Sequence, residues 1–264
     1  MNVHDLVSDE LWATLAPLLP PHPPHPRGGR PWLPDRPALC GLLDVLKTGI
    51  QWRRLPTALG CGSGVTCWRR RRDWQALHRV LLDRLGAAGH LDWSRASVAS
   101  ASVRATGGAR RPAPPRPTAP RPGTKHHRVV DRRGLPLACG LTGANRPDHP
   151  VFAALLAAVP PIRQPNGRRR KRPLKRHADK GYDYPACRQL LHRRGIRCRI
   201  ARTGVARADR LGRHRWVVER TLAWLHHFRR LAVRSERRDD LHHAFLDLGC
   251  ALRCLRFLHH PDPL

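Results

Sequence analysis

Acidic side chains are scarce in this chain. Its 264 residues include 19 Asp and Glu against 50 Lys and Arg, which gives a formal net charge of +31 at pH 7. Such an excess of one charge opposes compact folding unless a polyanion lies alongside. We therefore predict a nucleic acid as the partner. A GC-biased coding sequence, which favours Arg, Ala, Pro and Gly codons, explains part of the same excess.

Long apolar runs are also missing. No stretch approaches the roughly 20 apolar residues that a membrane span needs. The first twelve residues, MNVHDLVSDELW, carry acids and lack the basic and then apolar pattern of a signal peptide. We therefore expect a cytoplasmic, nucleoid-associated protein with no membrane partner.

The sequence has eight cysteines but no C-x-x-C pair. In a cytoplasmic protein these cysteines are expected to be reduced thiols. The 17 histidines lie mostly in doublets, such as those at 126–127 and 242–243, without metal-ligand spacing to a cysteine. A structural zinc site is therefore not predicted.

Residues 1–90 are predicted to form a small, basic, all-helical domain. Leucines recur at helical spacing, and Ser8, Asp35 and Ser63 are placed to cap helix N-termini. A Pro-rich connector separates the first two helices. The predicted helices cover residues 8–19, 36–49, 64–74 and 74–85.

Four successive arginines, Arg69, Arg70, Arg71 and Arg72, lie in the third predicted helix. A short basic helix that follows another helix and a turn resembles a helix-turn-helix contact with DNA. A solvated basic face has the same pattern. Both interpretations stay open at this point.

Residues 91–264 show a different pattern. Three strand-like segments are followed by a helix and then by alternating strands and helices, which is typical of an α/β domain. The predicted strands cover residues 97–103, 125–131, 135–141, 174–178 and 196–201. The predicted helices cover residues 149–159, 184–194, 213–230 and 240–258.

Two basic segments interrupt this domain. Residues 107–123 are rich in Pro and Arg and contain no acid and no large apolar residue, which indicates a disordered or extended loop. Residues 163–173, RQPNGRRRKRP, are predicted to be a flexible loop that can touch phosphates.

Few acids remain in the second half, so their positions are informative. Asp179 directly follows a predicted strand, and Glu219 lies on the helix after the last strand. Carboxylates brought together by a fold can share divalent metal ions, as two-metal phosphoryl-transfer sites require. Acids at the ends of strands and on helices are also common without a metal, so this pair alone decides nothing.

Long strings in both halves carry a resemblance to a known family. The N-terminal ones are VSDELWATLAPLLP, GRPWLPDRPAL, LKTGIQWRRLP and GCGSGVTCWRRRRDW. The C-terminal ones are SASVRA, PGTKHHRVVDRRGLPL, HADKGYDYP and LGRHRWVVERTLAWLHHFRRL. Over nearly its whole length the sequence resembles the DDE transposases of bacterial insertion elements.

The resemblance implies an α/β fold, with an RNase H-like mixed sheet and flanking helices behind a small helix-turn-helix-like domain. It also implies three metal-binding acids that hold Mg²⁺ or Mn²⁺. Asp179 stands at the second acidic position and Glu219 at the third. The first acid of the family's DSASVRA string is replaced here by Ala99.

Three other acids are candidates to replace the missing carboxylate at position 99. Asp92 lies seven residues upstream, about 23 Å along an extended chain. Asp131 is interpreted as a turn former before RRG, and Asp148 as a helix N-cap. Arg215 shares a helical face with Glu219, and it either binds a DNA phosphate near the metals or pairs with Glu219.

The resemblance implies DNA cleavage and strand transfer on duplex DNA, at the element's terminal repeats and its target, by a homodimer. Because position 99 is alanine, we expect this copy to be catalytically impaired. The alternative function is that of a non-catalytic DNA-binding protein that represses or inhibits active copies.

Overall fold

The computed structural model describes residues 7–19, 21, 32–70, 75–106, 123–203 and 209–261. Arg71, Arg72 and the predicted loop up to residue 122 lie outside the described residues. Arg215 lies within a described helix, but its side chain lies outside the described part. None of the described helices is long and apolar enough to cross a membrane.

The N-terminal part is helical, as predicted. Helix α2 (Asp9–Leu15) begins at Ser8, whose hydroxyl accepts a hydrogen bond from Leu11 N at 3.2 Å. Helix α4 (Gly64–Arg70) is capped in the same way by Ser63, which accepts from Thr66 N at 3.2 Å. Both caps satisfy backbone donors that a helix start leaves unpaired. Helix α5 covers Gln75–Ala87.

Helix α3 (Asp35–Thr48) begins one residue earlier than predicted. Its N-cap is Pro34, so Asp35 is the first helical residue and does not occupy the cap position. The carboxylate still lies near the positive end of the helix, where it is favourable. Gly49 ends the helix with φ +72°, a conformation that glycine adopts without strain.

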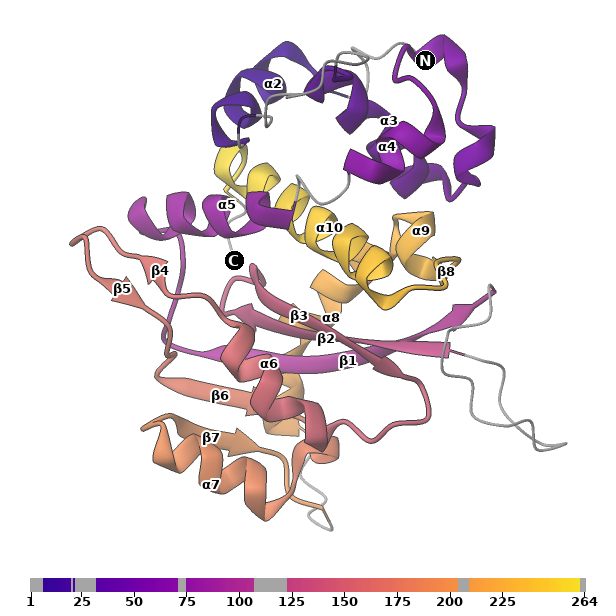
Figure 1. The fold of residues 1–264 in the computed structure, drawn as a ribbon. Helices are drawn as coiled ribbons and strands as arrows, with labels where there is room; N and C mark the ends of the chain where they lie inside the picture. Colours follow the sequence, from indigo (N-terminus) through magenta and orange to yellow (C-terminus); the bar gives the residue numbers. More distant parts are fainter. Residues whose placement is uncertain are drawn as a thin grey trace, which may run out of the picture.

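The C-terminal part is built on a mixed sheet of order β3-β2-β1-β6-β7 (Figure 1). The antiparallel strands are β1 (Ala96–Ala105), β2 (Gly123–Asp131) and β3 (Pro136–Gly143). The parallel strands β6 (Lys175–Ala178) and β7 (Arg197–Ile200) extend the sheet beyond β1. The two-residue strand β8 (Val233–Arg234) pairs with the end of β1.

Helices cover both faces of this sheet. One face carries α8 (Asp209–His226) and α10 (Asp239–His259), which contact β1, β2 and β3. The other face carries α6 (Phe152–Ala158), against β2 and β3, and α7 (Pro185–Arg193), against β7. Side chains alternate between the faces of a strand. Thus Cys139 of β3 meets α10, and Gly140 meets Leu155 of α6.

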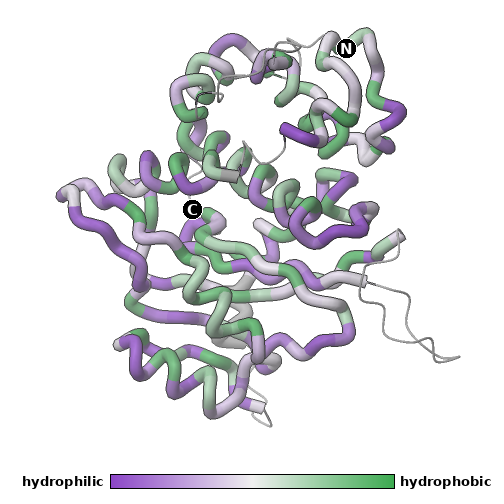
Figure 2. Tube along the Cα trace, in the orientation of Figure 1, coloured by the Kyte–Doolittle hydropathy of each residue, from purple (hydrophilic) through white to green (hydrophobic). Residues whose placement is uncertain are grey.

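The basic segment 163–173 is more ordered than predicted. Strands β4 (Ile162–Arg163) and β5 (Arg169–Arg170) form an antiparallel hairpin beside α5. Asp83 of α5 accepts a hydrogen bond from Arg163 N at 2.9 Å and pairs with Arg169 at 3.3 Å. Figure 2 shows this hairpin as largely hydrophilic, whereas hydrophilic and hydrophobic residues are mixed along the sheet and the helices.

The helical part and the sheet share one hydrophobic core, in which α5 lies beside α10 (Figure 1). The short helix α9 (Arg229–Ala232) carries Arg230, which is 4 % exposed. Its guanidinium donates to the carbonyls of Gly49 and Ile50, at 2.9 and 3.0 Å, and pairs with buried Glu236 at 2.6 Å. This arginine therefore ties the end of α3 to the C-terminal helices.

We expect the substitution Arg230→Met to lower the free energy of unfolding by about 3–5 kcal/mol, because it leaves Glu236 as a buried, under-paired carboxylate. Urea denaturation measures the change. The matched control is Arg238→Met, whose ion pair with Asp240 is exposed, and it should lower the free energy by less than about 1 kcal/mol. Equal effects of the two substitutions would contradict the anchoring role.

Candidate functional site

The parallel pairing of β1 with β6 brings Ala99 and Asp179 to the same level of the sheet. Ser97 pairs with His177, and each candidate residue lies two positions further along its strand. Asp179 directly follows β6 and begins the short turn η6 (Lys180–Tyr182), in which its Oδ1 accepts a hydrogen bond from Gly181 N at 3.0 Å. The carboxyl ends of parallel strands meet at one edge, so this position follows from the topology.

Helix α8 crosses the sheet at Ala99. Ala99 is 3 % exposed and lies in a small apolar cluster with Val130, Val217, Val218 and Leu222. Glu219 follows Val218 on α8 and is exposed, and α8 also contacts β6. The three elements that carry the two acids and Ala99 are therefore neighbours in the fold.

Asp131 forms a turn, as interpreted from the sequence. It is 1 % exposed, and its Oδ1 accepts hydrogen bonds from Arg133 N and Leu135 N at 2.9 and 2.8 Å. Its Oδ2 accepts from Asp92 N at 2.9 Å. Asp92 and Asp131 therefore organise the chain at the start of β1 and at the β2–β3 turn. Asp131 pairs with Ala96, so both acids lie at least three residues along the sheet from the level of Ala99.

Asp148 does not cap a helix, which corrects the interpretation from the sequence. Its side chain makes no capping bond. It accepts hydrogen bonds from Ser100 Oγ and Lys125 Nζ, both at 2.8 Å. Burial opposes its ionisation, but the bonds from Lys125 and Ser100 outweigh burial and hold the pKa of Asp148 below its usual value.

The Asp148 carboxylate nevertheless comes near Asp179. A Cβ atom on Gly181 would lie 3.1 Å from Asp179 Oδ1 and 3.4 Å from Asp148 Oδ2. Ser100, which binds Asp148, points to the opposite face of β1 from Ala99, because neighbouring residues of a strand alternate. Asp148 thus approaches Asp179 from the other face of the sheet, already neutralised by Lys125.

A basic pocket of about 750 Å³ opens beside β6 and β7. Its lining includes His177, which lies two residues before Asp179. Its walls include six Lys and Arg side chains from five segments of the chain, together with His177 of β6. Two of the six, Arg132 and Arg188, have acidic partners. The six are Arg95, Arg132, Lys175, Arg188, Arg199 and Arg202. Such a concentration of positive charge in a concave surface attracts phosphate groups.

The arginines of α4 do not form one exposed row. Arg69 is exposed, but Arg70 is 3 % exposed. Arg70 donates to Leu33 O at 2.8 Å, pairs with Asp35 and lies over the ring of Trp32. It holds α4 against the start of α3, so Arg70 is not part of an exposed basic face.

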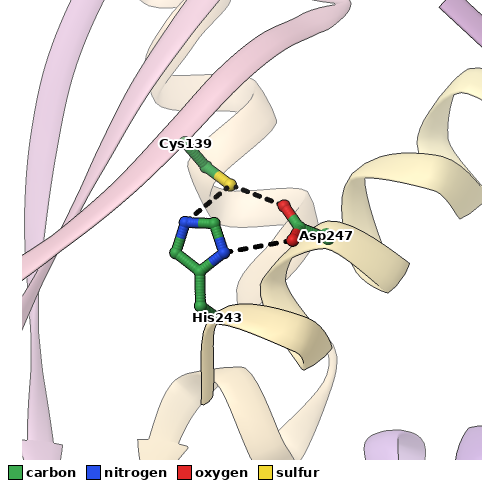
Figure 3. Close-up of side chains that lie close together, drawn as sticks. All are labelled: Cys139, His243 and Asp247. Atoms are coloured by element: carbon green, nitrogen blue, oxygen red, sulfur yellow. Dashed lines mark hydrogen bonds and ion pairs between the residues drawn. The ribbon is translucent and has the colours of Figure 1, made fainter. Parts of the chain in front are cut away.

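A Cys, a His and an Asp meet between β3 and α10 (Figure 3). Cys139 Sγ donates to Asp247 Oδ1 at 3.1 Å, and His243 Nδ1 lies 3.0 Å from Asp247 Oδ2. Zinc accepts such ligands, and sequence spacing did not indicate this group. The three side chains already satisfy one another, and the positive charge of nearby Arg128 acts on His243 and opposes a divalent cation. We interpret the group as a structural contact that holds α10 on β3.

Two family models match the chain. Residues 7–80 match the model described as a putative transposase of the IS4/5 family, and residues 91–253 match the transposase DDE domain. The second match covers more than half of the chain. The chain belongs to the DDE transposases. The expected α/β fold, with a mixed sheet, flanking helices and a helical N-terminal region, is confirmed.

Two curated relatives from Burkholderia cepacia are similar to this transposase. One is the putative transposase for insertion sequence element IS402, 51% identical over 142 residues, which are 54% of this chain and 67% of the relative. The other is an uncharacterized 16.2 kDa protein of insertion element IS402, 51% identical over 110 residues, with 39% of this chain and 75% of the relative covered.

Among solved structures, the chain is similar to a pre-cleavage Mos1 transpososome and to the Mos1 mariner paired end complex with Mn. Each comparison has a TM-score of 0.36 and covers 89% of this chain and 79% of the other. Sequence identity is 12% and 11%.

The transposase should lose stability as the pH falls, in part through His127 of β2. Burial lowers the pKa of His127 to about 4, whereas the unfolded value is about 6.5. Between these pH values the unfolded chain binds a proton that the folded chain excludes. Stability is therefore complete above about pH 6.5 and falls by on the order of 3 kcal/mol as the pH drops to about 4.

We expect His127→Gln to reduce this acid destabilisation. The measurement is the difference in urea midpoint between about pH 7 and about pH 4.5. The exposed His192→Gln variant serves as the control and should keep the full difference. A full difference in His127→Gln as well would show that His127 is not a principal source of the effect.

Proposed function

We propose that this transposase binds the duplex DNA of insertion-element ends and holds it in the basic pocket beside Asp179. The observation that supports this proposal is the gathering of six cationic side chains around β6 and β7, beside the strand that leads into Asp179. His177, which lines the pocket, is two residues before Asp179 on the same strand, roughly 7 Å along it.

The two regions take different parts of this task in the proposal. Residues 1–90 form the helical DNA-binding domain and residues 91–264 the DDE transposase domain. Arg69 is the exposed cation of α4 that contacts a phosphate, with Arg71 and Arg72 as proposed neighbours, and Arg215 contacts DNA near the acids. The protein acts as a homodimer at the cytoplasmic nucleoid.

The family's metal site is Mg²⁺- or Mn²⁺-dependent, with Asp179 and Glu219 at the second and third acidic positions. Ala99, at the first acidic position, does not fit a site for two divalent ions. Ala99 offers no oxygen and is enclosed by valines and a leucine. Two such ions repel each other strongly unless anionic oxygens lie between them. We therefore propose that this copy is catalytically impaired.

A second candidate function follows from the same observations. A transposase that keeps the basic pocket and lacks the first acid retains DNA binding without cleavage. Such a chain would occupy element ends and act as a repressor or inhibitor of active copies. The alanine at position 99 favours this role.

Replacing Lys175, Arg199 and Arg202 with glutamine should weaken binding to duplex DNA. Each lost phosphate contact reduces the slope of log K against log salt by about 0.9, so the triple variant should lose up to about 2.7. The salt dependence is measured by fluorescence anisotropy. The control replaces three exposed arginines outside the pocket and outside the basic segment 163–173, namely Arg193, Arg229 and Arg237. An equal loss of slope in the control would contradict a specific role for the pocket.

We expect no strand cleavage from the unaltered chain on terminal-repeat DNA with Mg²⁺ or Mn²⁺. Without the acid at position 99, neither an activated nucleophile nor a stabilised leaving oxygen is provided. A gel assay for nicked product measures this activity. Robust metal-dependent cleavage that Asp179→Asn abolishes would refute the impairment while leaving DNA binding intact.

A further inference from the structure

Arg128 is a buried cation directly across the ladder from Ala99. The antiparallel register of β1 and β2 pairs the two residues, so their side chains leave the same face of the sheet. Arg128 is 0 % exposed. Its Nε and Nη2 have no hydrogen-bond partner, and Nη1 makes one long contact of 3.5 Å with His127 O. Among the described residues, no carboxylate forms an ion pair with it.

The groups around this guanidinium do not compensate its charge. His126 and His242 lie beside it with their Nε2 atoms 2.8 Å apart. Burial first, and then the charge of Arg128, lowers the pKa values of His126 and His226. The nearby acids are occupied. Glu236 pairs with Arg230 and His242, and Asp247 pairs with His243.

An acid at position 99 would be within reach of this cation. Cβ atoms of directly opposed residues in an antiparallel pair lie about 4.5–5.5 Å apart, which an aspartate and an arginine span easily. The surrounding valines and leucine exclude water and leave an aspartate no other described cation on that row. A buried charge without a partner is strongly unfavourable, so the two charges would pair.

We infer that Arg128 is set to neutralise any acid restored at position 99, so that Ala99→Asp alone does not rebuild the metal site. The inference rests on the proposed function in taking position 99 as the first acidic position. It adds that two residues prevent metal binding at this site. Ala99 lacks a carboxylate, and the guanidinium of Arg128 competes with a metal ion for any carboxylate placed there. A divalent cation binds well only when both are changed.

The test is a double-mutant cycle with Ala99→Asp and Arg128→Met, read by thermal unfolding and by Mn²⁺ titration followed by EPR. With Arg128 present, Ala99→Asp should be tolerated, whereas in the Arg128→Met chain it should lower Tm, with a coupling of at least about 3 °C. The double variant should bind Mn²⁺ at least about tenfold more tightly than Ala99→Asp alone.

The matched control is Arg176→Met. Arg176 is equally buried, and its Nε and Nη1 also lack partners, but it pairs with Ala96 and therefore lies on the opposite face. It should show no coupling to Ala99→Asp. Zero coupling at Arg128, or equal Mn²⁺ affinity with and without Arg128, would overturn the inference.

The single variants decide the matter if the double variant does not fold. Ala99→Asp should then be more stable than Ala99→Asn at neutral pH, because only the aspartate pairs with Arg128. An asparagine variant of equal or greater stability would overturn the inference. None of these readouts uses DNA, so failure here is separate from failure of the DNA-binding proposal.

Discussion

The pairing of β1 with its two main neighbours is the constraint on which the rest of the molecule depends. β1 is the strand where the antiparallel and parallel halves of the sheet meet. Its parallel partner brings Asp179 level with Ala99, and its antiparallel partner sets Arg128 opposite the same residue. Since side chains alternate along a strand, a shift of one residue would exchange the two faces and move Ala99 away from α8.

Positive charge is handled in two different ways in this fold. Cations that carry structure are buried and saturated, as Arg230 is by Glu236 and two carbonyl groups. Other cations line the concave pocket beside β6 and β7, where Arg132 and Arg188 also have acidic partners. Arg128 belongs to neither class, because it is buried and its Nε and Nη2 have no hydrogen-bond partner in the described part of the chain. Arg128 lies opposite Ala99, so this cation faces the position of the missing acid.

Local signals in the sequence predicted much of the fold. The caps at Ser8 and Ser63 and the order of strands and helices were readable, because each depends on a few neighbouring residues. The roles of two other residues were not predictable from the sequence, because their partners are distant along the chain. Asp148 is defined by Ser100 and Lys125, and Arg70 by Leu33 and Asp35. The site acids themselves came from family resemblance, and their roles stay a prediction.

The position of α10 has a consequence for synthesis of the chain. This helix is the last described element, yet it packs on α5, and its Phe245 stacks on Trp52 with ring centroids 5.6 Å apart. The first ninety residues therefore lack one wall of their core until α10 has left the ribosome. Domains usually fold from the N-terminus during translation. Here the core of the helical region is completed only after α10 has been synthesised, so its apolar face stays uncovered until then.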